Sequence, residues 1–462
     1  MTAMSQSTRR LHLGLMFWAT GTHAAGWRLP DAREDAAFDI EFLQHVTQVA
    51  ERARFDFLFL GDRLATDPRL QRTNPAQMSR LEPFTTAASL AAATSRIGIV
   101  VTANPTYYDP YSVARLMGSL DHVSAGRASW NIVTGADDIA AANFSRTEHW
   151  ETGRRYDWAD EFVDVVKALW DGAPSAEAPG GVPLDHDGRH FRIAGPLDVP
   201  RLPQRHAVIL HAGTSERSRE LGAREADVIF AGQPDIPSAQ AYYADIKQRA
   251  ARYGRGEHEI AILPGLTPIV APTTEEAVAI YDRLNAFLPL DPEETAGEVR
   301  KGGLGRGRRR NLSALSETLG VDVRGNDPGD AVAPALAEQA SEAGRRLIDE
   351  TARRTRRSLA GPARISYRDL IDTAGAMGAI VVGNPEEVAD FIQAWFDQRA
   401  ADGFNIFPAY VPGAVEAFAE LVVPVLQRRG LFRLDYEGPT FRDHLGLGLP
   451  GARRDRDQLV RL

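Results

Sequence analysis

SLDHVSAGRASWNIVTG, residues 119–135, is the stretch that decides the fold of this chain. Its first part continues a helical pattern, Ser124–Arg127 contains a glycine and is typical of a turn, and Ala128–Val133 is a short, mostly apolar run. A helix that passes through a tight turn into a buried strand is typical of a parallel α/β core. Asn131 lies in the last part of this strand, and Thr134 follows it. Because the carboxyl ends of barrel strands face the ligand, both residues are site candidates by position.

Runs of strand length alternate with helical patterns along most of the chain. Eight such alternations predict an α/β fold, a TIM (β/α)8 barrel with insertions. A doubly wound open sheet is the alternative, although the Gly-x-Gly-x-x-Gly fingerprint of dinucleotide binding is missing after the first strand. The predicted strands are Leu11–Phe17, Phe55–Leu60, Ile97–Val101, Ala128–Val133, Ala207–Leu210, Val228–Ala231, Ala261–Val270 and Phe404–Phe407. The predicted helices include Ile40–Arg54, Phe84–Ala93, Tyr111–Val123, Trp158–Trp170, Ser215–Ala226 and Ala239–Tyr253.

Two stretches interrupt this alternation within what we predict to be a single domain over residues 1–462. Residues 172–205 are rich in Gly, Pro, Asp and His and predict a surface insertion with a hairpin around DHDGRHF. Residues 290–363 form a longer insertion, which we expect to cover the mouth of the barrel. Its arginine cluster at 300–310 is typical of a solvated loop, and a clamp for an anionic substrate is the alternative.

The composition favours a protein that acts on small molecules over one that binds nucleic acid or a membrane. The formal net charge of -9 and the pI near 5.7 give no basic footprint for nucleic acid or for an anionic membrane. The absence of cysteine excludes disulfides, thiol nucleophiles and cysteine-ligated metals. Arg9 and Arg10 precede the apolar run Leu11–Ala19 as in a twin-arginine signal, but His12 and Gly14 interrupt that run, which fits a buried first strand better. With no segment of about 20 apolar residues to span a bilayer, we expect a cytoplasmic protein.

The residues at the predicted strand ends are mostly neutral hydrogen-bonding groups. Such a ring suits a flat heterocycle with amide-like edges better than a metal, which needs clustered histidines and carboxylates. No His-x-His or His-Glu-x-x-His pattern is present, so no metal site is predicted. The strand-end residues are His23, Trp27, Asp62, Thr102, Asn104, Asn131, Thr134, Gly213, Thr214, Ser215 and Gln233.

Gly213, Thr214 and Ser215 follow a predicted strand and open a helix. The free N–H groups of a helix start, together with the two hydroxyls, suit a phosphate, whereas ordinary N-capping is the alternative. Tyr156 either reaches such a phosphate or packs in the core. His23 places a titratable group at the mouth of the barrel, unless it is a structural histidine of the loop.

Six segments together resemble the flavin-dependent monooxygenases of the bacterial luciferase-like superfamily, in the branch of nitrilotriacetate and dibenzothiophene-sulfone monooxygenases. Each segment is weak alone, and the set is specific. The segments are GTHAAGWRLP (21–30), FDFLFLGDRL (55–64), LMGSLDHVSAGRASWNIVTG (116–135), RRYDWADEFVDVVKALW (154–170), HAGTSERSRELGAREADVIF (211–230) and ADGFNIFP (401–408).

This resemblance implies a TIM barrel that binds FMN at the carboxyl ends of its strands. By this resemblance, the flavin ring or ribityl chain would be contacted by Asp62, Thr102, Asn131 and Thr134. The phosphate would be held by Tyr156, Gly213, Thr214 and Ser215. We assign catalysis to His23, as a hydrogen-bond partner of the oxygenated flavin or of the substrate. The chain departs from common family patterns at Gly135, where serine is frequent, and at His211, where glutamine is frequent.

The implied reaction is that of a two-component monooxygenase. A separate NAD(P)H-dependent flavin reductase supplies reduced FMN, and O2 then provides the atom that enters a small organic substrate such as an organosulfur compound, an aminopolycarboxylate or an alkane. Relatives suggest a homodimer or homotetramer. The alternatives are a deazaflavin-dependent oxidoreductase of the same superfamily, a non-catalytic FMN-binding protein and, last, a metal-free TIM-barrel hydrolase, for which Asp62 lacks an acidic partner.

Overall fold

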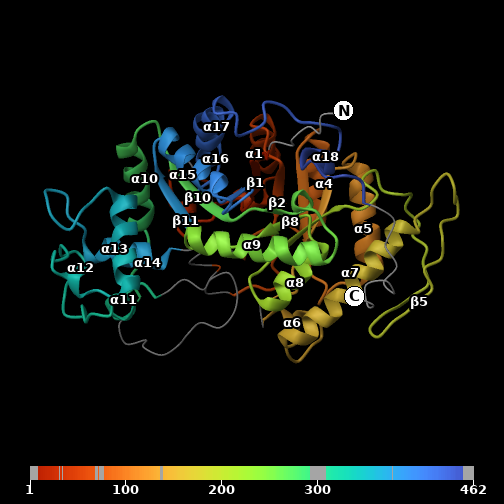
Figure 1. Ribbon diagram of the computed structural model, residues 1–462, viewed down its shortest axis with the longest axis horizontal. Helices are drawn as coiled ribbons and strands as arrows, with labels where there is room; N and C mark the ends of the chain where they lie inside the picture. The colour runs from red at the N-terminus through yellow and green to blue at the C-terminus, as the bar shows by residue number, and fades with distance from the viewer. Residues whose placement is uncertain are drawn as a thin grey trace.

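One curled, all-parallel sheet organises the molecule (Figure 1). The computed structural model describes residues 9–30, 32–33, 35–67, 71, 78–135, 139–291, 309–376 and 378–450. In this part of the chain the sheet has ten strands in the order β11-β10-β12-β1-β2-β3-β4-β7-β8-β9. The strands are β1 (His12–Met16), β2 (Phe57–Leu60), β3 (Gly98–Ala103), β4 (Ala128–Ile132), β7 (Val208–Ala212), β8 (Val228–Phe230), β9 (Ala261–Ile262), β10 (Gly265–Val270), β11 (Ala379–Gly383) and β12 (Gly403–Ile406).

The two ends of the curl meet at β12. The amide of Asp402 donates to the carbonyl of Ile262 at 2.8 Å, and the amide of Asn405 donates to the carbonyl of Pro264 at 2.9 Å. β9 and β10 are two pieces of the run that the sequence predicted as one strand. The register partners can be followed from strand to strand around the eight positions of the ring, starting and ending at β12. The residue reached on β12 has a number eight lower than the starting residue, and this offset is the shear of a TIM barrel. The predicted barrel is confirmed, and β11 is an added strand that the sequence analysis missed.

Helices cover the outside of the sheet, and their amino ends carry the residues that favour a helix start. Asp39, Asp109 and Asp235 each accept a backbone N–H of the first turn, and proline follows the last two. The six predicted helices are present, although the fourth starts at Thr152 and not at Trp158, which places Tyr156 inside it. The helices around the sheet are α1 (Ile40–Arg52), α4 (Pro83–Ala92), α5 (Pro110–Val123), α7 (Thr152–Asp171), α8 (Glu216–Glu225), α9 (Ile236–Arg252), α10 (Thr274–Ala286), α15 (Pro385–Asp397), α16 (Gly413–Ala417) and α17 (Val423–Arg428).

The turn between α5 and β4 is locked from within. Ala125 and Gly126 have φ angles of 53° and 83°, and the buried side chain of Arg127 then folds back to donate to the carbonyls of Ser124 (2.7 Å) and Ile97 (3.0 Å). These bonds fasten the end of one helix to the start of two neighbouring strands. The sequence stretch that predicted the fold is therefore also one of its fixed points.

The amino ends of the strands are closed by the last part of the chain. Phe441, in the short helix α18 (Phe441–His444), lies under Gly98 and makes an edge contact with Phe57 at 5.8 Å. Beside it, the fully buried carboxylate of Asp56 accepts from the Leu13 amide at 2.7 Å and pairs with Arg433. The carboxyl ends of the strands are on the opposite side, where the candidate residues were predicted.

The two insertions lie outside this barrel. The first contains the predicted hairpin, formed by the antiparallel strands β5 (His186–Asp187) and β6 (Arg192–Ile193), and this prediction is confirmed. In the second, residues 292–308, which hold most of the arginine cluster, are outside the described part. From residue 309 on, helices with a small apolar core of their own pack beside α10 and β11 (Figure 1). They are α11 (Leu312–Leu319), α12 (Leu336–Gln339) and α13 (Glu342–Thr355), followed by α14 (Tyr367–Gly375). No helix of the described residues is long and apolar enough to cross a membrane.

Candidate functional site

Thr102 and Asn131 are direct register partners on β3 and β4 and point into the barrel. Trp130 and Ile132, which flank Asn131, pack into the core under the helices, so the side chain between them faces inward. The Asn131 Nδ2 donates to the Thr102 Oγ1 at 2.9 Å. Its Oδ1 is buried and has no hydrogen-bond partner among the described residues. A buried amide oxygen without a partner fits a site that is completed by a ligand or by water.

Beyond β4 the chain turns away through Thr134 and Gly135. The Thr134 carbonyl accepts from the Thr106 hydroxyl at 2.8 Å and from Arg155 Nη1 at 3.3 Å. Gly135 has a φ angle of 81°, and a Cβ there would lie 2.8 Å from the amide nitrogen of Asn104. A side chain at position 135 would therefore be strained and crowded.

The predicted phosphate-binding residues gather where β7 passes into α8. Gly213 has a φ angle of 143°, its carbonyl accepts from the Tyr242 hydroxyl at 3.0 Å, and the Tyr156 hydroxyl lies 4.0 Å from where a Cβ on Gly213 would be. Ser215 caps α8 by accepting the Ser218 amide at 3.3 Å, so the N-capping alternative is part of the structure. Thr214 and Ser215 are exposed. The start of α8 is thereby open to an anion.

Glu216, in the first turn of α8, is the group that would repel such an anion. Both of its carboxylate oxygens are held by Arg249, at 2.6 and 3.0 Å. Because this pairing offsets the negative charge, the helix start keeps its suitability for a phosphate.

His211 joins the Asn131 strand end to this loop. Its Nδ1 lies 2.8 Å from the Ile132 carbonyl and its Nε2 lies 2.8 Å from the Ser218 hydroxyl. A carbonyl only accepts, so Nδ1 carries the proton and Nε2 accepts from Ser218. Burial lowers the pKa of His211 to about 4 and keeps the ring neutral. Asn131 and Ser215 therefore belong to one connected end of the molecule.

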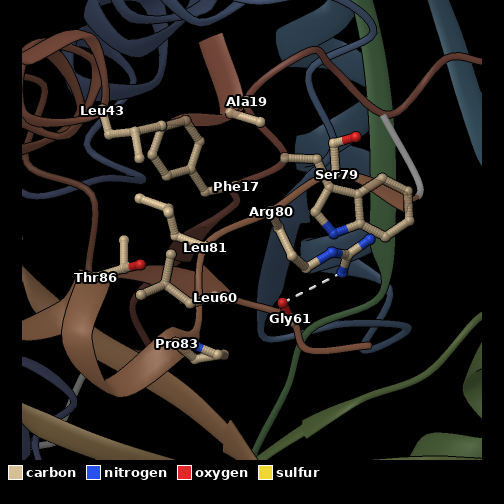
Figure 2. A pocket seen from close by; sticks show the side chains of 12 residues that line it. Phe17, Ala19, Leu43, Leu60, Gly61, Ser79, Arg80, Leu81, Pro83 and Thr86 are labelled. Carbon is tan, nitrogen blue, oxygen red and sulfur yellow. Dashed lines mark hydrogen bonds between the residues drawn. The ribbon is translucent and has the colours of Figure 1, made fainter. Parts of the chain in front are cut away.

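Asp62 lies on the neighbouring arc, after β2. Its carboxylate accepts the Arg63 amide at 2.7 Å, and burial raises its pKa. Next to it, Arg80 donates to the Gly61 carbonyl at 3.3 Å and stacks on the Trp18 ring at 5.2 Å, in a small pocket between the ends of β1 and β2 (Figure 2). Burial lowers the pKa of Arg80 to about 10, against the opposing effect of Asp62.

His23 follows β1 on the same side. Its Nδ1 accepts the Ala25 amide at 3.1 Å, and its other nitrogen interacts with the side chain of Asn285. Burial, aided by the charge of Arg310, lowers the pKa of His23 to about 4. The ring is thus neutral, with its proton on Nε2, and both nitrogens are already engaged.

The nine residues that were given a flavin, phosphate or catalytic role all lie at the carboxyl ends of the strands or in the segments that follow them. Thr102, Asn131 and the Gly213–Ser215 loop are connected through the contacts above, whereas Asp62 and His23 occupy the arc after β1 and β2. No group of three histidines or carboxylates that could hold a metal occurs in the described ranges. An uncharged, partly unsatisfied interior beside an open helix start fits a neutral heterocycle that carries a phosphate.

Two further residues were missed from the sequence. His211 had been noted only as a departure from the family pattern, and no local signal identifies the residues that it joins. Asn405 lies in ADGFNIFP, and the alternation of apolar Phe404 and Ile406 around it could have placed its side chain inside the barrel.

Comparison with known proteins identifies the family and supports the fold. The family model "Luciferase-like monooxygenase" matches residues 15–402. The chain is 39% identical over 469 residues to nitrilotriacetate monooxygenase component A of Aminobacter aminovorans, covering 96% of this chain and 98% of that protein. It is 34% identical over 469 residues to dibenzothiophene-sulfone monooxygenase of Rhodococcus erythropolis (strain XP), with 96% and 98% covered. The solved structure of EDTA monooxygenase from Chelativorans sp. BNC1 matches with a TM-score of 0.75 and 28% identity, over 95% of this chain and 99% of that one.

The fold is an α/β barrel, and the relatives at 34–39% identity, which are named monooxygenases, make the protein an oxidoreductase. The chain belongs to the luciferase-like monooxygenase family, as the sequence motifs predicted.

Proposed function

We propose that the protein is a two-component, FMN-dependent monooxygenase, which takes reduced FMN from a separate NAD(P)H-dependent flavin reductase and uses O2 to oxygenate a small organic substrate. The observation that carries this proposal is the connection from Asn131 through His211 to Ser215, which puts an unsatisfied amide oxygen and an open helix start at one end of the barrel. A phosphorylated heterocycle needs both features at once.

The bound flavin would supply the oxygen chemistry, and the residues of the chain would hold and shield it. Thr102, Asn131, Thr134 and Asp62 would contact the ring or the ribityl chain. Tyr156, Gly213, Thr214 and Ser215 would hold the phosphate.

His23 would act from the arc after β1. Being neutral, it would donate a hydrogen bond from Nε2 to the reacting group or to the substrate once that nitrogen leaves Asn285, without transferring a charge. Oxygenation also requires that water be kept from the reacting atoms, and the apolar interior beneath the mouth serves that purpose.

The insertion at 290–363 is proposed as the substrate-side cover. Support comes from Arg310, the last residue of the arginine cluster, which pairs with Asp372 and lies close enough to His23 to lower its pKa. A positive charge beside His23 suits the carboxylates of an aminopolycarboxylate, and nitrilotriacetate is named in a relative at 39% identity. Organosulfur compounds remain in the proposed range because a relative at 34% identity is a dibenzothiophene-sulfone monooxygenase. Cytoplasmic location and assembly as a homodimer or homotetramer complete the proposal.

The test combines the purified protein with any flavin reductase, NADH, FMN and 18O2, and offers nitrilotriacetate, EDTA and dibenzothiophene sulfone in parallel. Mass spectrometry is expected to find one 18O atom in the product of at least one compound. Tight FMN binding without substrate-stimulated oxygen uptake would favour a flavin-storage protein, and binding of a deazaflavin in preference to FMN would favour the oxygen-independent alternative. Either result would contradict the proposed activity.

A further inference from the structure

The interior of the barrel contains a second asparagine level with Asn131. Following the register partners once around the ring leads to a residue number eight lower on β12. Residues at the same height along the barrel axis are therefore found by adding one residue to the register partner at each of the eight steps. From Asn405 on β12, such a path meets Phe59 on β2, Asn131 on β4 and Phe230 on β8 as the inward residues. This is the layer of four side chains from alternate strands that fills a TIM barrel. Asn405 and Asn131 stand four strands apart, on opposite sides of the ring.

The register partners of Asn405 offer its side chain no hydrogen bond. Its register partners are Gly14 on β1 and Gly265 on β10, which have no side chains. The aromatic rings of Phe57 and Phe230 occupy the space at these glycines. Asn405 is only 1% exposed, and neither its Nδ2 nor its Oδ1 has a hydrogen-bond partner within the described part of the chain.

An interior amide of this kind is costly for the protein alone. Burying a donor and an acceptor without partners loses their hydration and returns no hydrogen bond. A leucine of similar size would fill the position without that loss, yet the chain has an amide here, between the two phenylalanines of the layer. A ligand with matching polar groups would explain the choice.

We propose that Asn405 is a flavin-binding residue, whose amide hydrogen-bonds the amide-like edge of the isoalloxazine opposite Asn131. This inference rests on the proposed function, since it names a further contact of the same FMN site. An amide presents one acceptor and two donors, and the pyrimidine part of the flavin ring presents carbonyls beside an N–H. Phe59 and Phe230 provide the apolar remainder of the floor.

The test measures binding of two ligands and the stability of the protein without ligand, for wild type, Asn405→Leu and Asn405→Ala. FMN and riboflavin share the ring and differ in the phosphate. If Asn405 contacts the ring, both variants weaken FMN and riboflavin by the same factor, about tenfold or more, which corresponds to one well-formed hydrogen bond. The thermal midpoint of ligand-free Asn405→Leu is expected to equal or exceed that of wild type, because an unpaired amide has been removed.

Two control variants separate the possible causes. Ser215→Ala is expected to weaken FMN much more than riboflavin, because it acts at the phosphate. Ser129→Ala removes an interior hydroxyl that is satisfied by the Val208 carbonyl at 2.7 Å, two residues before Asn131 on β4. It is expected to lower the thermal midpoint and to leave both dissociation constants unchanged.

The proposal is overturned if wild type binds riboflavin and both Asn405 variants bind it equally well, in which case the amide holds only an internal water. If Asn405→Leu does not fold, Asn405→Ala, which adds no bulk, decides. Failure of wild type to bind either flavin would overturn the proposed function itself, and that outcome is distinct from the first.

Discussion

The Nε2 atom of His211 and the hydroxyl of Ser218 lie 2.8 Å apart, at the point where β7 passes into α8. On its other side the same ring is bonded to the Ile132 carbonyl, so a single neutral imidazole ties β4 to the start of α8. The bond from Ser218 needs Nε2 to be unprotonated, whereas Nδ1 donates to the carbonyl in either charge state of the ring. The phosphate loop of the proposed site is therefore sensitive to acid through a residue that does not itself line the loop.

Replacement of His211 by glutamine is expected to reduce the acid sensitivity of the protein. The pKa of His211 is about 4 in the folded state and near 6.5 when unfolded, so the unfolded state binds more protons between these values and stability falls as the pH drops from 6.5 to 4. At pH 5 this costs about 2 kcal/mol relative to pH 7.5. Urea unfolding of His211→Gln at the two pH values should show a free-energy difference that is smaller by this amount. The contributions of His23 and His444, whose pKa values are also about 4, remain in the variant. The exposed His258→Gln is the control, and an unchanged pH slope in His211→Gln would contradict the prediction.

Gly213→Ala is expected to damage flavin binding and stability together. A Cβ at this position would lie 2.2 Å from the Ser218 hydroxyl oxygen, and the φ angle of 143° is strained for any side chain. The cost is about 1–3 kcal/mol, and the FMN dissociation constant should rise at least tenfold because the loop must move. Gly232→Ala is the matched control, since a Cβ there meets nothing within 4 Å. Fluorescence titration and thermal melts measure both effects, and equal behaviour of the two variants would refute the role of Gly213.

Asp56→Asn is expected to destabilise the closed end of the barrel without touching the site. The variant leaves the buried guanidinium of Arg433 without its counter-charge, which costs about 3–5 kcal/mol. Asp435→Asn removes a carboxylate that is 81% exposed and paired with Arg54, and should cost less than about 1 kcal/mol. Urea unfolding measures both. A loss below 1 kcal/mol for Asp56→Asn would show that the pair does not carry the closure.

The rate of the proposed reaction is expected to show no ionisation of His23 in the physiological range. With a pKa of about 4, the ring is neutral from pH 5.5 to 8.5 and cannot produce an inflection near 6.5. His23→Asn should lower product formation at least a hundredfold while the FMN dissociation constant stays within a factor of two. An inflection near pH 6.5 that disappears in His23→Asn would show that this histidine works as a titrating base.

The barrel was predictable because amphipathic helices lie between most of the strand-length runs, as on the amino-terminal side of Ala128–Val133. β11 was not predicted, because Ala379–Gly383 pairs only at the edge of the sheet and lies outside the regular alternation of strands and helices. The gap between β9 and β10 is marked in the sequence by Pro264–Gly265, a dipeptide that is typical of a turn, and the prediction of one strand over Ala261–Val270 did not use this signal.

Within the site, Thr102 and Asn131 were predictable from position, because strand ends of a parallel barrel meet at one edge. The neutral tautomers of His23 and His211 were not, because they depend on the Ala25 amide and the Ile132 carbonyl, groups that every residue possesses. The level relation between Asn405 and Asn131 needs the register of all eight strands, which no single segment of sequence encodes.

The pairing of β1 with both β2 and β12 has a consequence for synthesis. The first strand to leave the ribosome is completed by a neighbour that emerges almost four hundred residues later, and Phe441, which seals the base, follows later still. At about 5–20 residues per second, a growing chain spends tens of seconds with an unpaired strand edge. Until residue 403 has been made, the sheet cannot close, and we expect a nascent chain of this protein to expose an unpaired strand edge for most of its translation.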